Sequence, residues 1–198
     1  MTQPIRCSCG KFKGTLARTH KENRGLCYCT DCQAFARYLR RAEQILDRNG
    51  GTDIIQTTPK HVSFTDGIEH LACMRLTPNG LLRWYASCCN TPIGNTLANY
   101  KLSFVGLVHN CLESAPVSLD EAFGPIRMQL KTRSAQGKPK PKAFGLPAAM
   151  VRIASMLLKA RLDGSYKRTP FFIPGSNTPL VTPKVLSPQE REEVMYAA

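Results

Sequence analysis

The sequence predicts a mainly β domain of short antiparallel strands, held together by a cysteine-bound metal, with a helix after the second cysteine motif and a helical C-terminal extension. Three observations lead to this prediction. Seven of the nine cysteines fall into three tight groups, as metal ligands do. Short apolar runs separated by turn residues fill the chain from residue 52 to residue 108, which is typical of strands. A helical apolar period follows the second cysteine group and recurs in the last third of the chain.

The cysteines are expected to bind metal rather than to form disulfides. The first residues contain no apolar stretch of the kind that marks a secretory signal, and no run approaches the length of a membrane span. Nine cysteines without an export signal are typical of metal binding in a reducing compartment. We therefore expect a cytoplasmic protein without a membrane-spanning segment.

The first cysteine group predicts a tight turn. Cys7 and Cys9 are separated by one serine and followed by Gly10, and an alternating strand is expected over residues 11–16. The pair therefore lies where a turn enters the first strand.

The second cysteine group leads into a helix. Thr30 and Gln33 are interpreted as a capping box at its start, and Cys32 falls in the first turn, where free N–H groups and the helix dipole favour a thiolate. The helix is expected to end at residues 49–50, an Asn-Gly pair. Its apolar face comprises Phe35, Tyr38, Leu39, Ala42, Ile45 and Leu46.

The next part of the chain predicts short strands. Their apolar runs lie at residues 54–55, 62–64, 71–76, 81–85 and 102–108. Asn79 and Gly80 lie between two of these runs and are the strongest hairpin signal in the chain. The hairpin delivers the third cysteine group, Cys88 and Cys89, at its far end.

The chain changes character near residue 112, so we divide it into a metal-binding domain over residues 1–112 and a basic extension over residues 113–198. Residues 127–168 carry 11 Lys and Arg against one Asp, a net charge of +10, whereas residues 1–126 carry a net charge of +4. Positive charge of this kind suits nucleic acid, acidic lipid or an acidic protein partner.

Two helices are expected in the extension, both packed on the first domain, after an exposed basic linker over residues 137–142. The first begins at Pro147, and we expect its apolar face to dock on the protein, although a basic amphipathic helix could also contact a membrane. This face comprises Met150, Val151, Ile153, Ala154, Leu157 and Leu158. The second helix begins at a capping box formed by Ser187 and Glu190.

The seven grouped cysteines divide into a set of four and a set of three. Zinc takes four thiolates in a closed structural site, or three protein ligands and an open position in a reactive site. If the first turn and the last strand end meet, a closed site can form from Cys7, Cys9, Cys88 and Cys89. An open site then remains at Cys27, Cys29 and Cys32. Such an open site can bind and deprotonate a thiol or polarise an oxygen. With one closed and one open site, we expect one or two zinc ions per chain.

The order Cys-x-Cys-Gly, then Cys-x-Cys-x-x-Cys, then an aromatic-led strand ending in cysteine and threonine resembles the Gfa-like family of glutathione-dependent formaldehyde-activating enzymes, whose domain also occurs in centromere protein V. The resemblance covers about residues 5–110. It implies a zinc-stapled β-tent fold, a structural zinc at the first and last cysteine pairs, and a catalytic zinc at the middle three cysteines. The implied reaction is the reversible joining of formaldehyde to glutathione, as in a carbon–sulfur lyase, with glutathione as the small thiol substrate.

The sequence departs from the family pattern at two positions. Ala86 occupies the first ligand position of the last motif, so Cys88 must substitute for it, or the site keeps three protein ligands. Because neighbouring side chains on a strand point to opposite faces, Cys88 and Cys89 can both ligate only within a turn, which Asn90 permits. Gln33 stands where the family usually has a basic residue. Either the carboxylates of glutathione are bound by arginines of the following helix, or these residues form a solvated face: Arg37, Arg40 and Arg41.

Other assignments stay open. Cys73 is expected in the core, and His109 or Cys111 could supply a missing ligand, since residues i and i+2 share a strand face. The alternative function is a non-catalytic zinc module whose basic C-terminal segment binds nucleic acid or another acidic partner. Residues 127–143 contain no interleaved aromatics for base stacking. Iron–sulfur is a third reading of the cysteines, but their spacing matches no four-cysteine cluster motif. Nothing in the sequence indicates the oligomeric state.

Overall fold

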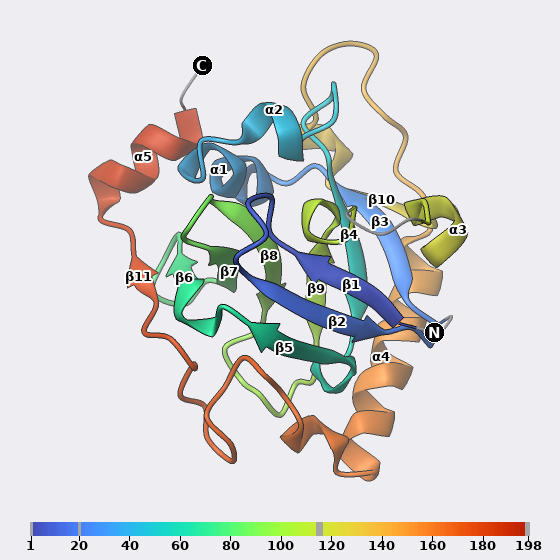
Figure 1. Cartoon of the computed structure of the whole chain (residues 1–198). Helices are drawn as coiled ribbons and strands as arrows, with labels where there is room; N and C mark the ends of the chain where they lie inside the picture. The colour runs from blue at the N-terminus through green and yellow to red at the C-terminus, as the bar shows by residue number, and fades with distance from the viewer. Residues whose placement is uncertain (1, 20, 114–116, 197–198) are drawn as a thin grey trace.

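The computed structural model describes residues 2–19, 21–113 and 117–196, and these form two β-sheets accompanied by five α-helices (Figure 1). The smaller sheet has the order β1-β2-β5, with β1 (Thr2–Arg6), β2 (Lys13–Ala17) and β5 (Val62–Asp66). The larger sheet has the order β10-β3-β4-β9-β8-β7-β6-β11. Its strands are β3 (Asn23–Cys27), β4 (Thr52–Thr57), β6 (Leu71–Arg75), β7 (Leu82–Ala86), β8 (Thr91–Thr96), β9 (Val105–Val108), β10 (Met128–Leu130) and β11 (Lys184–Val185). The predicted mainly β architecture is confirmed.

The main core lies between the two sheets. Trp84 of β7 is completely buried there, and its indole N–H donates to Thr96 Oγ1 at 2.9 Å. Phe171, from the C-terminal extension, packs against both Trp84 and Phe64, with ring centroids 5.2 Å apart in each pair. Cys73 is buried in the same core, as predicted. The extension therefore supplies part of the core of the preceding strands.

The other face of the larger sheet is covered by α1 (Thr30–Tyr38), α2 (Ala42–Ile45) and α5 (Pro188–Tyr196). A second core forms there from Phe35, Leu39, Met74, Val108 and Leu186. The apolar side chains predicted from the helical period therefore do pack in a core.

The helix after the second cysteine motif differs from the prediction at both ends. The proposed capping box is wrong, because Cys29 is the N-cap and its sulfur accepts from the backbone N–H of Cys32. The amide of Gln33 instead donates to the carbonyls of Tyr28 and Ser134, both at 3.0 Å. Arg40 has a φ of 54° and interrupts the helix, so the apolar period spans α1 and α2 rather than one continuous helix.

The predicted hairpin is confirmed, since β6 and β7 pair antiparallel on either side of the Asn79–Gly80 turn. Five strands were not predicted: β1, β3, β8, β10 and β11. β3 covers Asn23–Cys27, a stretch without an alternating apolar pattern. β1 carries a buried Gln3, and β8 is rich in polar residues although all six are buried. These polar side chains are satisfied by tertiary hydrogen bonds, such as Gln3 Nε2 to the carbonyl of Leu112 at 2.9 Å, which sequence patterns do not reveal.

Residues of the extension add a strand to each edge of the larger sheet. β10 pairs parallel with β3, and β11 pairs parallel with β6. The described part of residues 113–198 contains three helices rather than the predicted two, because α3 (Leu119–Phe123) precedes α4 (Leu146–Leu162) and α5. Arg24 of β3 ties α3 to the sheet through ion pairs with Asp53 at 2.7 Å and Asp120 at 2.5 Å. The predicted capping box of α5 is confirmed by reciprocal hydrogen bonds between Ser187 and Glu190.

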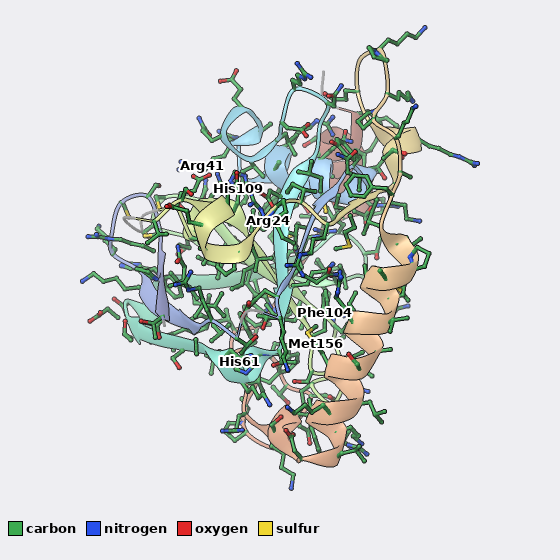
Figure 2. All side chains as sticks on the ribbon, turned by 90° about the vertical axis from the view of Figure 1, so that its right-hand side faces the viewer. Arg24, Arg41, His61, Phe104, His109 and Met156 are labelled. Carbon is green, nitrogen blue, oxygen red and sulfur yellow. The ribbon has the colours of Figure 1, made fainter. Side chains whose placement is uncertain are left out.

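α4 docks with a face that differs in part from the predicted one. Ala149 and Ala160 are buried, and Met156 lies on the side toward the sheet (Figure 2). Arg152, expected on the polar side, reaches inward to Asn23 Oδ1 at 3.5 Å. The predicted docking face is only partly confirmed. Ile153 and Leu157 are half-buried, but Met150, Val151 and Leu158 are 56%, 71% and 60% exposed. No helix among the described residues is long and apolar enough to span a membrane.

Phe171→Ala tests whether the extension is part of the core. We expect the free energy of unfolding to fall by about 3–5 kcal/mol, as for other buried Phe→Ala changes, measured by urea unfolding of the full chain. The matched control is Phe144→Ala, whose side chain is 46% exposed and whose effect should be within about 0.5 kcal/mol. Equal, small effects of both changes would contradict a shared core.

Candidate metal centres

One cysteine cluster joins two turns that are distant in the sequence. The turn after β1 carries Cys7 and Cys9, and the turn after β7 carries Cys88 and Cys89. Their Sγ atoms all lie within 4.8 Å of one another, and four of the pairs are 3.3–3.8 Å apart. All are free thiols. Four sulfurs around a tetrahedral zinc with Zn–S bonds of about 2.3 Å would be about 3.8 Å apart, so this closed cluster fits such a site.

The turn after β7 explains how two adjacent cysteines reach one cluster. β7 ends at Ala86, and the N–H of Cys89 donates to the Ala86 carbonyl at 3.3 Å. Asn90 has a φ of 54°, so the chain reverses before β8 begins at Thr91. Ala86 itself is buried in the core. Cys88 therefore lies where a fourth ligand is needed.

Hydrogen bonds hold the sulfur atoms of the closed cluster. The backbone N–H of Phe12 donates to Cys7 Sγ at 3.2 Å, and Thr91 Oγ1 lies 3.1 Å from Cys89 Sγ. Burial raises the pKa of the Cys89 thiol, but hydrogen bonds from Ser8 and Thr91 outweigh it and lower this pKa to about 5. Burial raises the pKa values of Cys7 and Cys88, so in the metal-free cluster the thiolate lies at Cys89.

Three further cysteines, here called the open cluster, meet at the N-terminus of α1. Cys27 is the last residue of β3 and pairs with Thr52 of β4 and Leu130 of β10. Cys29 caps α1, and Cys32 lies in its first turn. Their Sγ atoms are within 4.8 Å of one another. Cys32 is buried, whereas Cys27 and Cys29 are partly exposed.

Hydrogen bonds within the open cluster concentrate negative charge on one sulfur. Hydrogen bonds from the Cys27 and Cys32 thiols lower the pKa of Cys29. The nearby charge of Arg83 adds to this effect, so this pKa lies well below its usual range despite burial. The same bond to Cys29 raises the pKa of Cys27 to about 11, and the bond to Cys27 raises the pKa of Cys32. At neutral pH the metal-free cluster therefore carries one thiolate, at Cys29.

Arg83 is a charged group beside the open cluster that the sequence reading missed. It lies in β7 and is only 2% exposed. One guanidinium nitrogen is 3.6 Å from Asp31 Oδ2, another donates to Asn95 Oδ1 at 3.2 Å, and its Cζ lies 5.5 Å from the ring centroid of Phe35. An Arg between Leu82 and Trp84 in an apolar strand was a possible signal, because such residues are seldom buried without a partner.

Arg83→Met is expected to weaken zinc binding at the open cluster about tenfold, as loss of other groups around metal ligands does. Three thiolates and one Zn²⁺ leave a net negative charge, which the guanidinium offsets. The measurement is competition with a zinc chelator on the folded protein. Arg83→Lys keeps the positive charge and should lose less zinc affinity than Arg83→Met. If the zinc affinity of Arg83→Met equals that of the parent protein, the guanidinium contributes to packing only.

The C-terminal extension also supports the open cluster. The N–H of Tyr28 donates to the carbonyl of Leu130 at 3.0 Å. Gln33 bonds to Ser134 through its amide nitrogen, and its amide oxygen accepts from Gln136 Nε2 at 3.1 Å. Gln33 thus fastens the cysteine loop to the extension. No pattern in the sequence pointed to this contact.

Other candidates from the sequence are used elsewhere. Arg37 donates to the carbonyls of Val194 and Met195 in α5 at 3.2 and 3.4 Å, and Arg41 donates to Ser8 Oγ and the Cys89 carbonyl at 3.1 and 2.7 Å. Arg37 and Arg41 are therefore half-buried rather than fully solvated, and Arg40 is exposed. Binding of glutathione carboxylates by these arginines stays a prediction.

His109 and Cys111 lie outside both cysteine clusters. His109 bonds to the carbonyl of Ile45 and to Glu113, and Cys111 is completely buried against the carbonyl of Val108. The structure therefore does not bring either residue to the position of a missing ligand.

Comparison with known proteins adds one family. A family model described as a family of unknown function, DUF6151, matches residues 1–181. Among solved structures, the crystal structure of a Rhodobacter sphaeroides protein, a structural-genomics target, is 16% identical with a TM-score of 0.40. That match covers 66% of this chain and 100% of the other. A TM-score this low does not establish a shared fold. No curated protein matches the sequence.

Proposed function

Because the chain belongs to the DUF6151 family, whose function is unknown, we propose a function from its cysteine clusters: a zinc-dependent carbon–sulfur lyase-like enzyme acting on a thiol adduct such as S-hydroxymethylglutathione. The closed cluster would hold a structural zinc that staples a β-tent fold. The open cluster would hold a second zinc. The observation that carries the proposal is the separation of seven cysteines into one cluster of four and one of three.

The donor set supports zinc. Both clusters offer sulfur ligands, and each has one thiol whose pKa is lowered, at Cys29 and Cys89. Thiolates at tetrahedral spacing are typical of zinc, and a site with three protein ligands is typical of reactive zinc.

A zinc ion held by three thiolates supplies an open position that can bind a thiol and lower its pKa. The residues around the cluster have their own parts. The N–H groups of the first turn of α1 and the guanidinium of Arg83 stabilise negative charge at the cluster. In the proposed reaction the bond between the glutathione sulfur and the hydroxymethyl carbon breaks. The hydroxyl proton passes to the sulfur, which leaves glutathione and formaldehyde.

The direct test uses the zinc-loaded full chain. We expect two zinc ions per chain by elemental analysis, saturable glutathione binding, and a faster approach to equilibrium between glutathione, formaldehyde and their adduct than in buffer. If two zinc ions are present but the protein neither binds glutathione nor speeds the approach to equilibrium, this reaction is wrong. Other thiol adducts then become the substrates to screen.

The alternative is a non-catalytic zinc module whose basic segment binds nucleic acid. The exposed cations Lys138, Lys140 and Lys142 support it. It requires binding that falls steeply with salt and that is lost when these lysines become glutamine. DNA and RNA binding measured at two salt concentrations distinguishes this function from the enzymatic one.

A further inference from the structure

α4 has a second apolar face that points away from the protein. Six large hydrophobic side chains are 46–79% exposed on it or just before it: Phe144, Leu146, Met150, Val151, Leu158 and Leu162. We call these six residues the outer face. In the view of Figure 2 the body of the protein lies on one side of α4, and nothing covers the other.

The outer face is too concentrated to be ordinary surface. It holds six of the thirteen exposed large hydrophobic side chains among the described residues, within residues 144–162. Leu146, Met150, Leu158 and Leu162 are spaced by multiples of four. Each step of four turns by about 40° around the helix, so all four fall within one half of its circumference. Contiguous apolar patches on soluble proteins commonly mark interaction sites.

Positive charge lies on both sides of the outer face in the sequence. Exposed basic residues precede it at Lys138, Lys140 and Lys142 and follow it at Lys167 and Arg168, and the exposed Arg161 lies within α4 beside Leu162. Asp163, the acidic residue next to the outer face, is paired with Lys60 at 3.4 Å. A partner for this surface must therefore be both apolar and anionic.

We propose that the outer face of α4 docks on the surface of an anionic phospholipid membrane. The apolar side chains would enter the boundary between headgroups and acyl chains, while the flanking cations meet lipid phosphates. The helix would lie in the plane of the interface. A second copy of the chain would bring the basic residues of two outer faces together, and their charges would repel. Nucleic acid would bind these basic residues but leave the apolar side chains in water. An anionic bilayer matches both the apolar side chains and the positive charge. This inference does not depend on the metal chemistry.

Vesicle co-sedimentation of the zinc-loaded full chain tests the proposal. We expect binding to vesicles that contain phosphatidylglycerol, little binding to pure phosphatidylcholine vesicles, and weakening with salt. The double change Val151→Gln and Leu158→Gln should weaken binding at least about tenfold, because two apolar side chains no longer enter the interface. The matched control is Ile68→Gln, at a side chain 51% exposed outside α4, which should bind as the parent does. Zinc content and far-UV circular dichroism confirm that each variant is folded.

Three results would overturn the proposal. The first is no binding to anionic vesicles, or binding that the double change leaves unaltered. The second is a concentration-dependent dimer that the double change abolishes, which would assign the outer face to a second copy of the chain. The third is vesicle binding that the double and control variants lose equally, which would make it a non-specific effect of surface apolarity.

Discussion

Cys29→Ser is expected to lower the metal content from two zinc ions per chain to one. Cys29 carries the thiolate of the open cluster, and a serine hydroxyl remains protonated and is a poor ligand for zinc. Serine is nevertheless a good N-cap, so α1 should persist. Elemental analysis of protein purified under reducing conditions should show the loss of one zinc, and activity on the thiol adduct should fall to background.

The control for this change is Cys73→Ala, which alters a cysteine of the core outside both clusters and should keep two zinc ions. Its stability can fall without a change in metal content. If the parent protein holds one zinc and Cys29→Ser keeps it, the open cluster binds no zinc, and the proposed enzyme is excluded in favour of a stapled binding module.

The cysteine clusters could be predicted from the sequence because most of their geometry is local. Spacings of two and three residues place sulfurs together in a turn or at a helix start, whatever the rest of the fold does. Joining Cys7 and Cys9 to Cys88 and Cys89 needed only the count of ligands that zinc takes. The structure brings these four together, and the turn at Asn90 has the positive φ that the prediction required.

The surroundings of the clusters could not be predicted, because they come from residues distant in the sequence. Arg83 reaches the open cluster across the sheet, and Ser134 and Gln136 reach Gln33 from the extension. The orientation of α4 was partly misjudged for a related reason. The helix is apolar on much of its surface, so its periodicity does not distinguish the side that docks from the side that stays exposed.

Cys88→Ser is expected to destabilise the whole fold, in contrast to Cys29→Ser. The closed cluster links a turn of the smaller sheet to a turn of the larger one, and the main core lies between these sheets. Structural zinc is worth about 10–16 kcal/mol in small zinc domains, so losing one of four ligands should remove much of the stability.

We therefore expect Cys88→Ser to lower the midpoint of thermal unfolding strongly and to lose both zinc ions, because unfolding also disperses the open cluster. Ser87→Ala changes an exposed neighbour in the same turn, whose hydroxyl donates to the carbonyl of His70, and should cost about 1 kcal/mol or less. Thermal unfolding followed by circular dichroism, with zinc measured on the same samples, separates the two variants. A Cys88→Ser protein that keeps its midpoint and both zinc ions would show that three cysteines suffice for the staple.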